Sequence, residues 1–153
     1  MFGFSKKATE TKSKFTDAQK SALAGGLAKM LLIQMTCAPV DPIEVTKIEV
    51  KKGHINRKAI GYIYGFIDSA IQCYGEDIAD VRVGPPILYH VLRALFSGHE
   101  REYMEFLMNH EDDQLVMLGK LEGGQQYIDF LPKPGVKRAP MGFARFIVED
   151  RQG

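Results

Sequence analysis

Residues 56–75, which read NRKAIGYIYGFIDSAIQCYG, decide the fold class that the sequence predicts. Isoleucines at helical spacing form one face of this segment: Ile60, Ile63, Ile67 and Ile71. Gly61, Gly65 and Ser69 form a second face of small residues. A helix that is apolar nearly all round is a buried helix. We therefore expect a buried central helix over residues 56–75, with Asn56 as its N-cap.

The small-residue face allows another backbone to approach closely, because little or no side chain stands in the way. We predict that its partner is a helix of the same chain, for instance the one that carries Gly25 and Gly26. The alternative is an interaction seam between two copies of the chain, formed by Gly61, Gly65 and Ser69.

A polar stripe interrupts the apolar surface of the central helix at Tyr64, Asp68 and Gln72. A carboxylate on such a helix must reach water or find a partner, since burying it alone costs several kcal/mol. One interpretation is structural, with Asp68 exposed or paired to Arg57, Arg82 or Arg93. The other is a ligand-binding pocket that uses Tyr64, Asp68 and Gln72, together with His90.

Three further helical segments flank the central one. The first runs from about residue 16 to 35 and opens with Thr16 and Gln19, which match a capping box. The second covers residues 86–109, with a bend or break near Gly98 and a second capping box at Ser97 and Glu100. The third begins at Asp112 or Asp113 and continues across Gly123 and Gly124, where a kink is plausible. These segments predict a mainly α protein, a compact bundle of four to six helices around the 56–75 helix.

Residues 41–53 fit two structures. Asp41, Pro42 and Glu44 are typical of a helix start, and a short helix is the interpretation we favour. The β-branched residues between 43 and 50 are typical of a strand instead. In that case residues 43–50 and 143–149 would form one small β element.

The 153-residue length fits one domain. We divide it into a flexible basic tail at residues 1–15 and a single helical domain at residues 16–153. The composition, 45% hydrophobic and 25% charged, is that of a globular protein. Cys37 and Cys73 form no CxxC motif, and we expect two small buried thiols. No segment is long and apolar enough to span a bilayer, and we expect a soluble, cytoplasmic protein.

The sequence contains no nucleotide-binding glycine motif, no GxSxG and no zinc-protease HExxH. His90, His99 and His110 lie near acidic residues, but none has a Glu three positions before it, as helical di-metal sites require. We therefore predict no metal and no cofactor. The net charge of +1 and the lack of a recognition motif argue against nucleic acid as a partner.

Charge is segregated along the chain. Residues 99–113 carry six acids and one arginine, whereas residues 132–145 carry four bases and no acid. Together with the small-residue seam and seven methionines, this favours an interaction protein, such as a small regulator or accessory subunit, that binds a protein partner or itself as a homodimer. A helical ligand-binding protein or enzyme that uses the polar stripe is the alternative. A metal-dependent enzyme built on the His and acidic segment ranks third.

Overall fold

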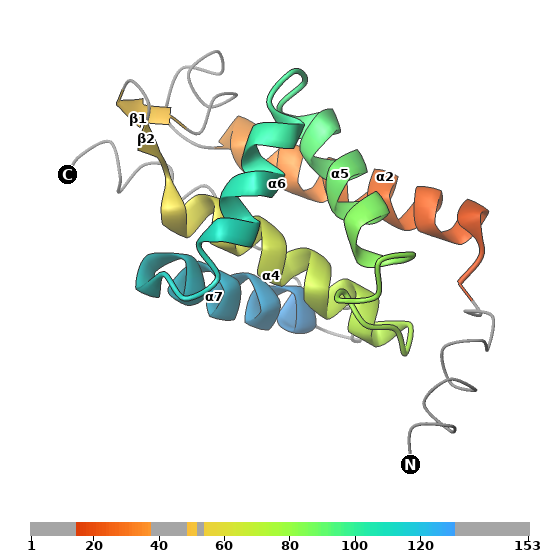
Figure 1. The fold of residues 1–153 in the computed structure, drawn as a ribbon. Coiled ribbons are helices and arrows are strands. Elements are labelled where there is room, and N and C mark those ends of the chain that lie inside the picture. The colour runs from red at the N-terminus through yellow and green to blue at the C-terminus, as the bar shows by residue number, and fades with distance from the viewer. Residues whose placement is uncertain (1–14, 38–48, 52–53, 131–153) are drawn as a thin grey trace.

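The computed structural model describes residues 15–37, 49–51 and 54–130, which form five helices and a short hairpin (Figure 1). The helices are α2 (Asp17–Cys37), α4 (Arg57–Cys73), α5 (Gly84–Leu95), α6 (Glu100–Asn109) and α7 (Gln114–Phe130). Strands β1 (Glu49–Lys51) and β2 (His54–Ile55) pair antiparallel. The predicted mainly α bundle around the 56–75 segment is confirmed.

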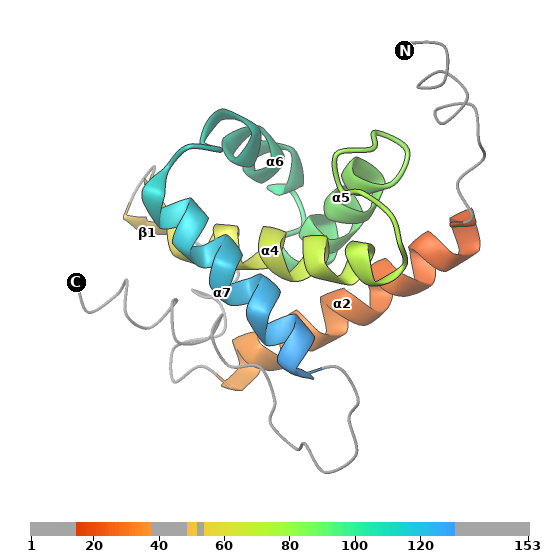
Figure 2. The ribbon, with the colours of Figure 1, turned by 90° about the horizontal axis from the view of Figure 1, so that it is seen from below.

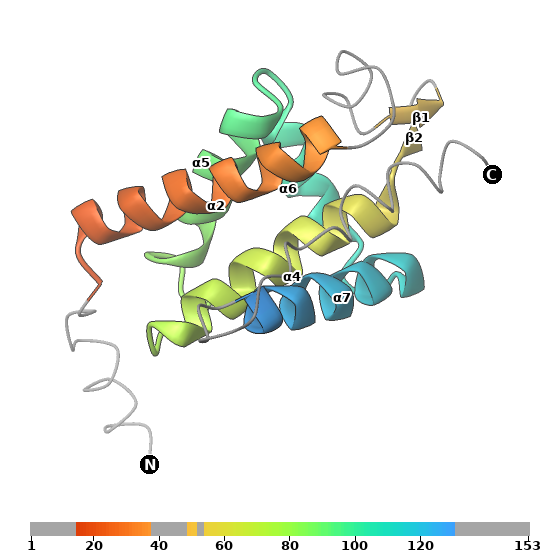
Figure 3. The same ribbon diagram turned by 180° about the vertical axis from the view of Figure 1, so that it is seen from behind.

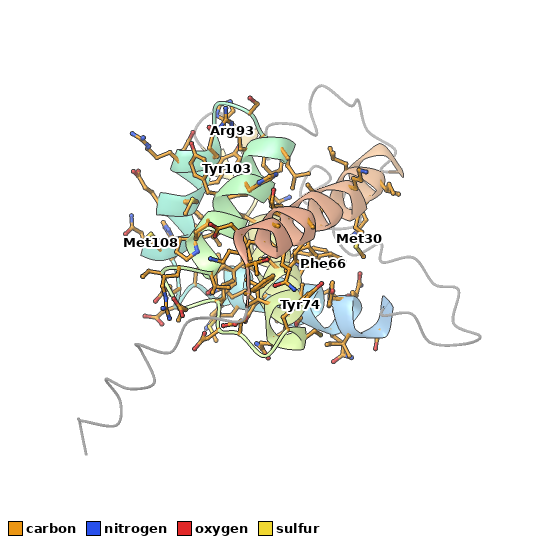
Figure 4. The ribbon with its side chains drawn as sticks, turned by 90° about the vertical axis from the view of Figure 1, so that its right-hand side faces the viewer. Met30, Phe66, Tyr74, Arg93, Tyr103 and Met108 are labelled. Atoms are coloured by element: carbon orange, nitrogen blue, oxygen red, sulfur yellow. The ribbon has the colours of Figure 1, made fainter. Side chains whose placement is uncertain are left out.

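Helix α4 is the centre of the bundle. Its four isoleucines are fully buried, and so are Tyr62 and Phe66. The Asn56 side chain accepts a hydrogen bond from the backbone N–H of Ala59 at 2.9 Å, so the predicted N-cap is confirmed. The aromatic ring of Phe66 lies inside the bundle (Figure 4), edge to face with the ring of Tyr127 of α7 at 5.1 Å between centroids.

Helices α4 and α7 run in the same direction and pack side by side through glycine (Figures 1 and 3). A Cβ added to Gly61 would collide with the carbonyl group of Val116, and a Cβ on Gly119 would collide with that of Lys58. Gly65 and Gly123 repeat this arrangement one turn later. Each glycine faces the carbonyl oxygen of the residue three positions before the opposing glycine. The contacts that α4 makes with α7 are therefore equivalent to those that α7 makes with α4, as if an approximate local twofold axis related the two helices.

The glycine contacts correct one expectation about the partner helix. A Cβ on Gly25 or Gly26 of α2 would meet nothing within 4 Å, so these two glycines are not the partners of Gly61 and Gly65. The third small residue of the stripe, Ser69, also faces α7: its hydroxyl lies 2.8 Å from the position of a Cβ built on Gly124. The stripe of Gly61, Gly65 and Ser69 is thus filled by a helix of the same chain.

In Figure 1, α2, α5 and α6 lie on the upper side of α4 and α7 lies on the lower side. Seen from below, α5 and α6 lie on one side of α4 and α2 lies on the other (Figure 2). Leu27 and Leu31 of α2 are buried in the core that these helices share with α4. Phe15 is also buried, and its ring stacks on that of Tyr74 at 4.8 Å between centroids. Phe15 therefore belongs to the core and not to the predicted tail, whose other residues lie outside the described part of the chain.

The helix ends confirm some capping predictions and correct another. Thr16 and Gln19 exchange backbone-to-side-chain hydrogen bonds of 2.9 and 3.1 Å, as a capping box requires. The predicted break falls at Gly98, whose φ of +94° few residues other than glycine adopt. Ser97 does not cap α6, because that helix begins at Glu100 with His99 as its N-cap residue. The Glu100 carboxylate instead accepts from the Gly98 N–H at 2.8 Å.

At the start of α7, the Asp113 carboxylate accepts from the N–H groups of Leu115 and Val116 at 2.9 and 3.1 Å. The expectation of an acidic cap at 112 or 113 is therefore confirmed at Asp113. Helix α7 continues without interruption through Gly123 and Gly124.

The structure corrects two sequence expectations, and the residues of a third lie outside the described part of the chain. Residues 49–51 form a strand, not the end of the favoured 41–53 helix, and their partner is β2. Residues 43–48 and 143–149 lie outside the described part of the chain. Cys73 is an exposed free thiol, not a buried one. In the described ranges, no helix combines the length and the hydropathy needed to cross a bilayer.

Candidate functional site

An apolar groove of about 410 Å³ lies where α4, α5, α6 and α7 meet. We call this the apolar groove. Its apolar walls come from the turn after α4 and from helices α5 and α6: Ile78, Val81, Pro85, Leu88, Met104, Leu107 and Met108. Its polar groups are the phenol of Tyr64, the carboxylate of Glu111 and the amine of Lys120. A groove with apolar walls and a few polar groups is the usual form of a binding site in a helical protein.

The turn between α4 and α5 holds one wall of the groove in place. A Cβ on Gly84 would collide with the Ile78 carbonyl, so only glycine allows the turn to close this tightly on α5. The Asp80 carboxylate accepts from the Arg82 backbone N–H at 2.9 Å and from its guanidinium at 2.9 and 3.1 Å. The Lys20 amine donates to the Arg82 carbonyl at 2.7 Å and fastens the turn to α2.

The Tyr64 ring and the Lys120 ammonium form the floor where α4 meets α7. The Lys120 nitrogen lies 4.3 Å from the ring centroid, which is a cation–π contact. Burial raises the pKa of Tyr64, and the carboxylates of Asp68, Glu111 and Asp77 raise it further. The phenol is therefore neutral at physiological pH and can donate a hydrogen bond, and several carboxylates lie near it.

The predicted polar stripe does not converge on one cavity. Tyr64 lines the apolar groove, whereas Asp68 lines a second hollow of about 350 Å³ between α4 and α7. Gln72 is exposed and donates to the Asp68 carboxylate at 3.0 Å. Lys120 lines both hollows and separates them.

None of the three predicted arginines forms an ion pair with Asp68 within the described ranges. Arg57 pairs with Asp113 at 2.8 Å, and Arg82 pairs with Asp80 at 2.9 Å. Arg93 lies in the last turn of α5, at the far end of that helix (Figure 4). Asp68 instead stands half-buried at the surface beside Gln72.

His90 lies apart from the polar stripe. It lines a small hollow of about 180 Å³ between α2 and α5, with Asp17 and Lys20 as the charged neighbours. His99 approaches Glu102 at 3.4 Å, and the His110 ring stacks on Phe106 at 3.9 Å between centroids. Among the residues that the structure describes, no three of His, Cys, Asp and Glu gather in a way that could hold a metal ion.

Two large apolar residues stand at the rim of the groove and face solvent. Val81 is 77% exposed and Met108 is 70% exposed. Figure 4 shows Met108 at the outer edge of the molecule. Neither residue was predicted from the sequence as part of a site. The spacing of Met104 and Met108, one helical turn apart, was the available signal that they share a face of α6. Only the folded chain brings the turn after α4 and helix α5 beside that face.

Comparison with known proteins gives no match: no protein family, no curated protein and no solved structure resembles this chain.

Proposed function

We propose that the protein is an interaction protein, and that it binds a segment of a partner protein in the apolar groove. The observation that carries this proposal is the exposure of Val81 and Met108 beside an apolar groove. Large apolar side chains held in water around a hollow are typical of surfaces that another molecule covers. Burying each of them on binding would contribute about 1–2 kcal/mol at 25 cal/mol per Å².

The rim favours a polypeptide over a small ligand. A small molecule that filled the groove would leave much of Val81 and Met108 in water, whereas a partner chain lying across the groove would cover both. Three apolar groups of α6 face this hollow, and two of them are methionines, Met104 and Met108. Methionine is unbranched and polarisable, so it adapts to the side chains of different partners.

The alternative of a ligand site on the polar stripe receives less support from the geometry. Tyr64 and Asp68 line different hollows, Gln72 is exposed, and His90 lines a third hollow. A ligand would need convergent polar groups for orientation and specificity, and these four residues do not supply them together.

Self-association stays a prediction, but the glycine seam does not support it. Helix α7 fills the stripe of Gly61, Gly65 and Ser69, so a second copy would have to use another surface. Light scattering over a range of protein concentrations measures the oligomeric state directly.

Peptide display from a random library, selected on the full chain, tests the proposal. We expect enriched peptides to share bulky apolar residues. We also expect Met108→Asp to weaken the binding of a synthetic enriched peptide by about tenfold or more, as for a central interface residue. Leu118→Asp is the matched control, because Leu118 is 52% exposed on α7 and does not line the groove.

Circular dichroism checks that both variants keep their helices. Peptides without bulky apolar residues, or peptides that bind Met108→Asp as tightly as wild type, would refute the proposal.

A further inference from the structure

We infer that the segment bound in the apolar groove is a basic amphipathic helix of a partner protein, an inference that rests on the proposed function. Its apolar face would lie on the methionine side of the groove, and its basic face would meet the carboxylates around the rim. Charge complementarity and the architecture of the groove carry the argument.

Helix α6 and the residues directly after it supply an apolar wall of the groove and several exposed acids. Met104, Leu107 and Met108 line the groove, and the exposed Glu105 lies on the same helix. Directly after the helix, Glu111 lines the groove and Asp112 is exposed beside it.

Glu105, Glu111 and Asp112 are available to a partner as far as the structure describes the chain. The ion pairs between described residues include Asp80, Asp113 and Glu102 but not Glu105, Glu111 or Asp112. Exposed carboxylates that lack a partner attract a basic segment over a distance of about 10 Å at 0.1 M salt.

On the α4 side, Tyr64 lies within electrostatic reach of Asp68, Asp77 and Glu111, although Asp68 itself lines the neighbouring hollow. Lys120 also lines the groove, with its ammonium over the Tyr64 ring. Residues 99–113, on α6 and directly after it, carry six acids against one arginine, and this excess of acids favours a basic segment over an acidic or a neutral one.

The walls of the groove favour a helical segment over an extended one. Among the residues that the structure describes, the walls come from helices and from the 76–83 turn, and no described strand contributes to them. An extended peptide gains affinity by adding a strand to an open sheet edge, which this groove does not offer. A helix satisfies its own backbone and presents apolar side chains at intervals of three and four residues.

Three synthetic peptides of about 14 residues, or four helical turns, test the inference on the full chain. All three carry leucine at the same helical positions, with lysine, glutamine or glutamate elsewhere. We expect fluorescence anisotropy to show that the lysine peptide binds about tenfold more tightly than the glutamine peptide, and that the glutamate peptide binds most weakly. Added salt should reduce the advantage of the lysine peptide.

Charge variants show where the preference arises. The double variant Glu105→Gln, Glu111→Gln should lose most of the difference in affinity between the lysine peptide and the glutamine peptide. Asp129→Asn is the matched control, because Asp129 is exposed at the other end of α7 and does not line the groove. It should keep the full preference.

The outcomes separate this inference from the proposed function. Equal binding of all three peptides, or tightest binding of the glutamate peptide, overturns the inference and leaves the proposed function standing. If the peptides selected by display bind and none of the three designed peptides does, the inference again fails alone. If neither set binds, both fail.

The chain's own basic C-terminal sequence is the competing occupant. A synthetic peptide of residues 132–149, PKPGVKRAPMGFARFIVE, is added to the full chain together with the lysine peptide. Displacement of the lysine peptide by residues 132–149, with loss of that binding in Met108→Asp, would assign the groove to the chain itself and overturn a partner in trans. No displacement supports the partner helix.

Discussion

A methyl group added to Gly61 should destabilise the protein, whereas the same methyl group on Gly26 should stabilise it. Both glycines lie inside helices, where alanine is favoured over glycine by about 1 kcal/mol. At Gly26 a Cβ meets nothing within 4 Å, so this gain is fully realised. At Gly61 a Cβ would lie 2.9 Å from the Val116 carbonyl carbon, inside the 3.4 Å where ordinary contact begins.

The loss of stability expected for Gly61→Ala depends on which atoms must move to make room for the methyl group. The colliding group at Gly61 is backbone, so α4 and α7 must separate along their glycine contacts. Overpacking of this kind costs about 1–3 kcal/mol, and a rigid backbone neighbour favours the upper end. After the gain in helix propensity, we expect Gly61→Ala to lose about 2 kcal/mol and Gly26→Ala to gain about 1 kcal/mol. For a chain of this size, those changes lower Tm by about 4–8 °C and raise it by about 2–4 °C.

Urea denaturation followed by circular dichroism measures both variants, and light scattering follows their oligomeric state. A Gly61→Ala variant as stable as wild type would refute the close approach of α4 and α7. A variant that keeps its stability but changes from a dimer to a monomer would place the glycine seam between two copies instead.

Two further predictions concern the core and the turn beside the groove. Phe15→Ala should destabilise the protein by about 3 kcal/mol in urea denaturation, because it leaves a cavity at a buried site against Tyr74. A loss below about 1 kcal/mol would show that Phe15 is not part of the core. The Arg82 side chain, followed by its backbone N–H, lowers the pKa of Asp80 from 3.8 to about 2. The charged form is therefore favoured in the folded state, and its contribution is present above pH 3.8 and lost as the pH falls toward about 2. We expect the stability difference between wild type and Asp80→Asn to shrink over that range in urea titrations, and a difference independent of pH would contradict the role of this contact.

The sequence predicted features that depend on local spacing. The isoleucines of α4 repeat at helical intervals, Asn56 stands directly before them, and Gly98 interrupts the following helix. Periodicity, capping and glycine breaks act over a few residues, so one sequence is enough to find them. The same reasoning placed the cap of α7 at Asp112 or Asp113, and the structure shows that Asp113 is the cap.

The partners of these elements were harder to predict, because helical spacing gives a face but not its neighbour. Gly119 and Gly123 repeat the four-residue spacing of Gly61 and Gly65, which the adjacent Gly25 and Gly26 lack, and this match was the available signal that α7 pairs with α4. Asp68 was expected to be exposed or paired to an arginine, and its half-buried carboxylate still reaches water and needs no arginine. The capping box at Ser97 failed because Gly98 turns the chain before the helix begins.

The glycine seam and the apolar groove are parts of one structural feature. The backbone carbonyl of Lys120 is the group that faces Gly65, and the side chain of Lys120 lies over the ring of Tyr64, the residue before Gly65. Because the backbones touch, the ammonium reaches the ring and closes the floor of the groove. A larger residue at position 65 would push α7 outward and carry Lys120 away from Tyr64. The small residues that hold the bundle together therefore also set the depth of the surface on which we propose that the partner binds.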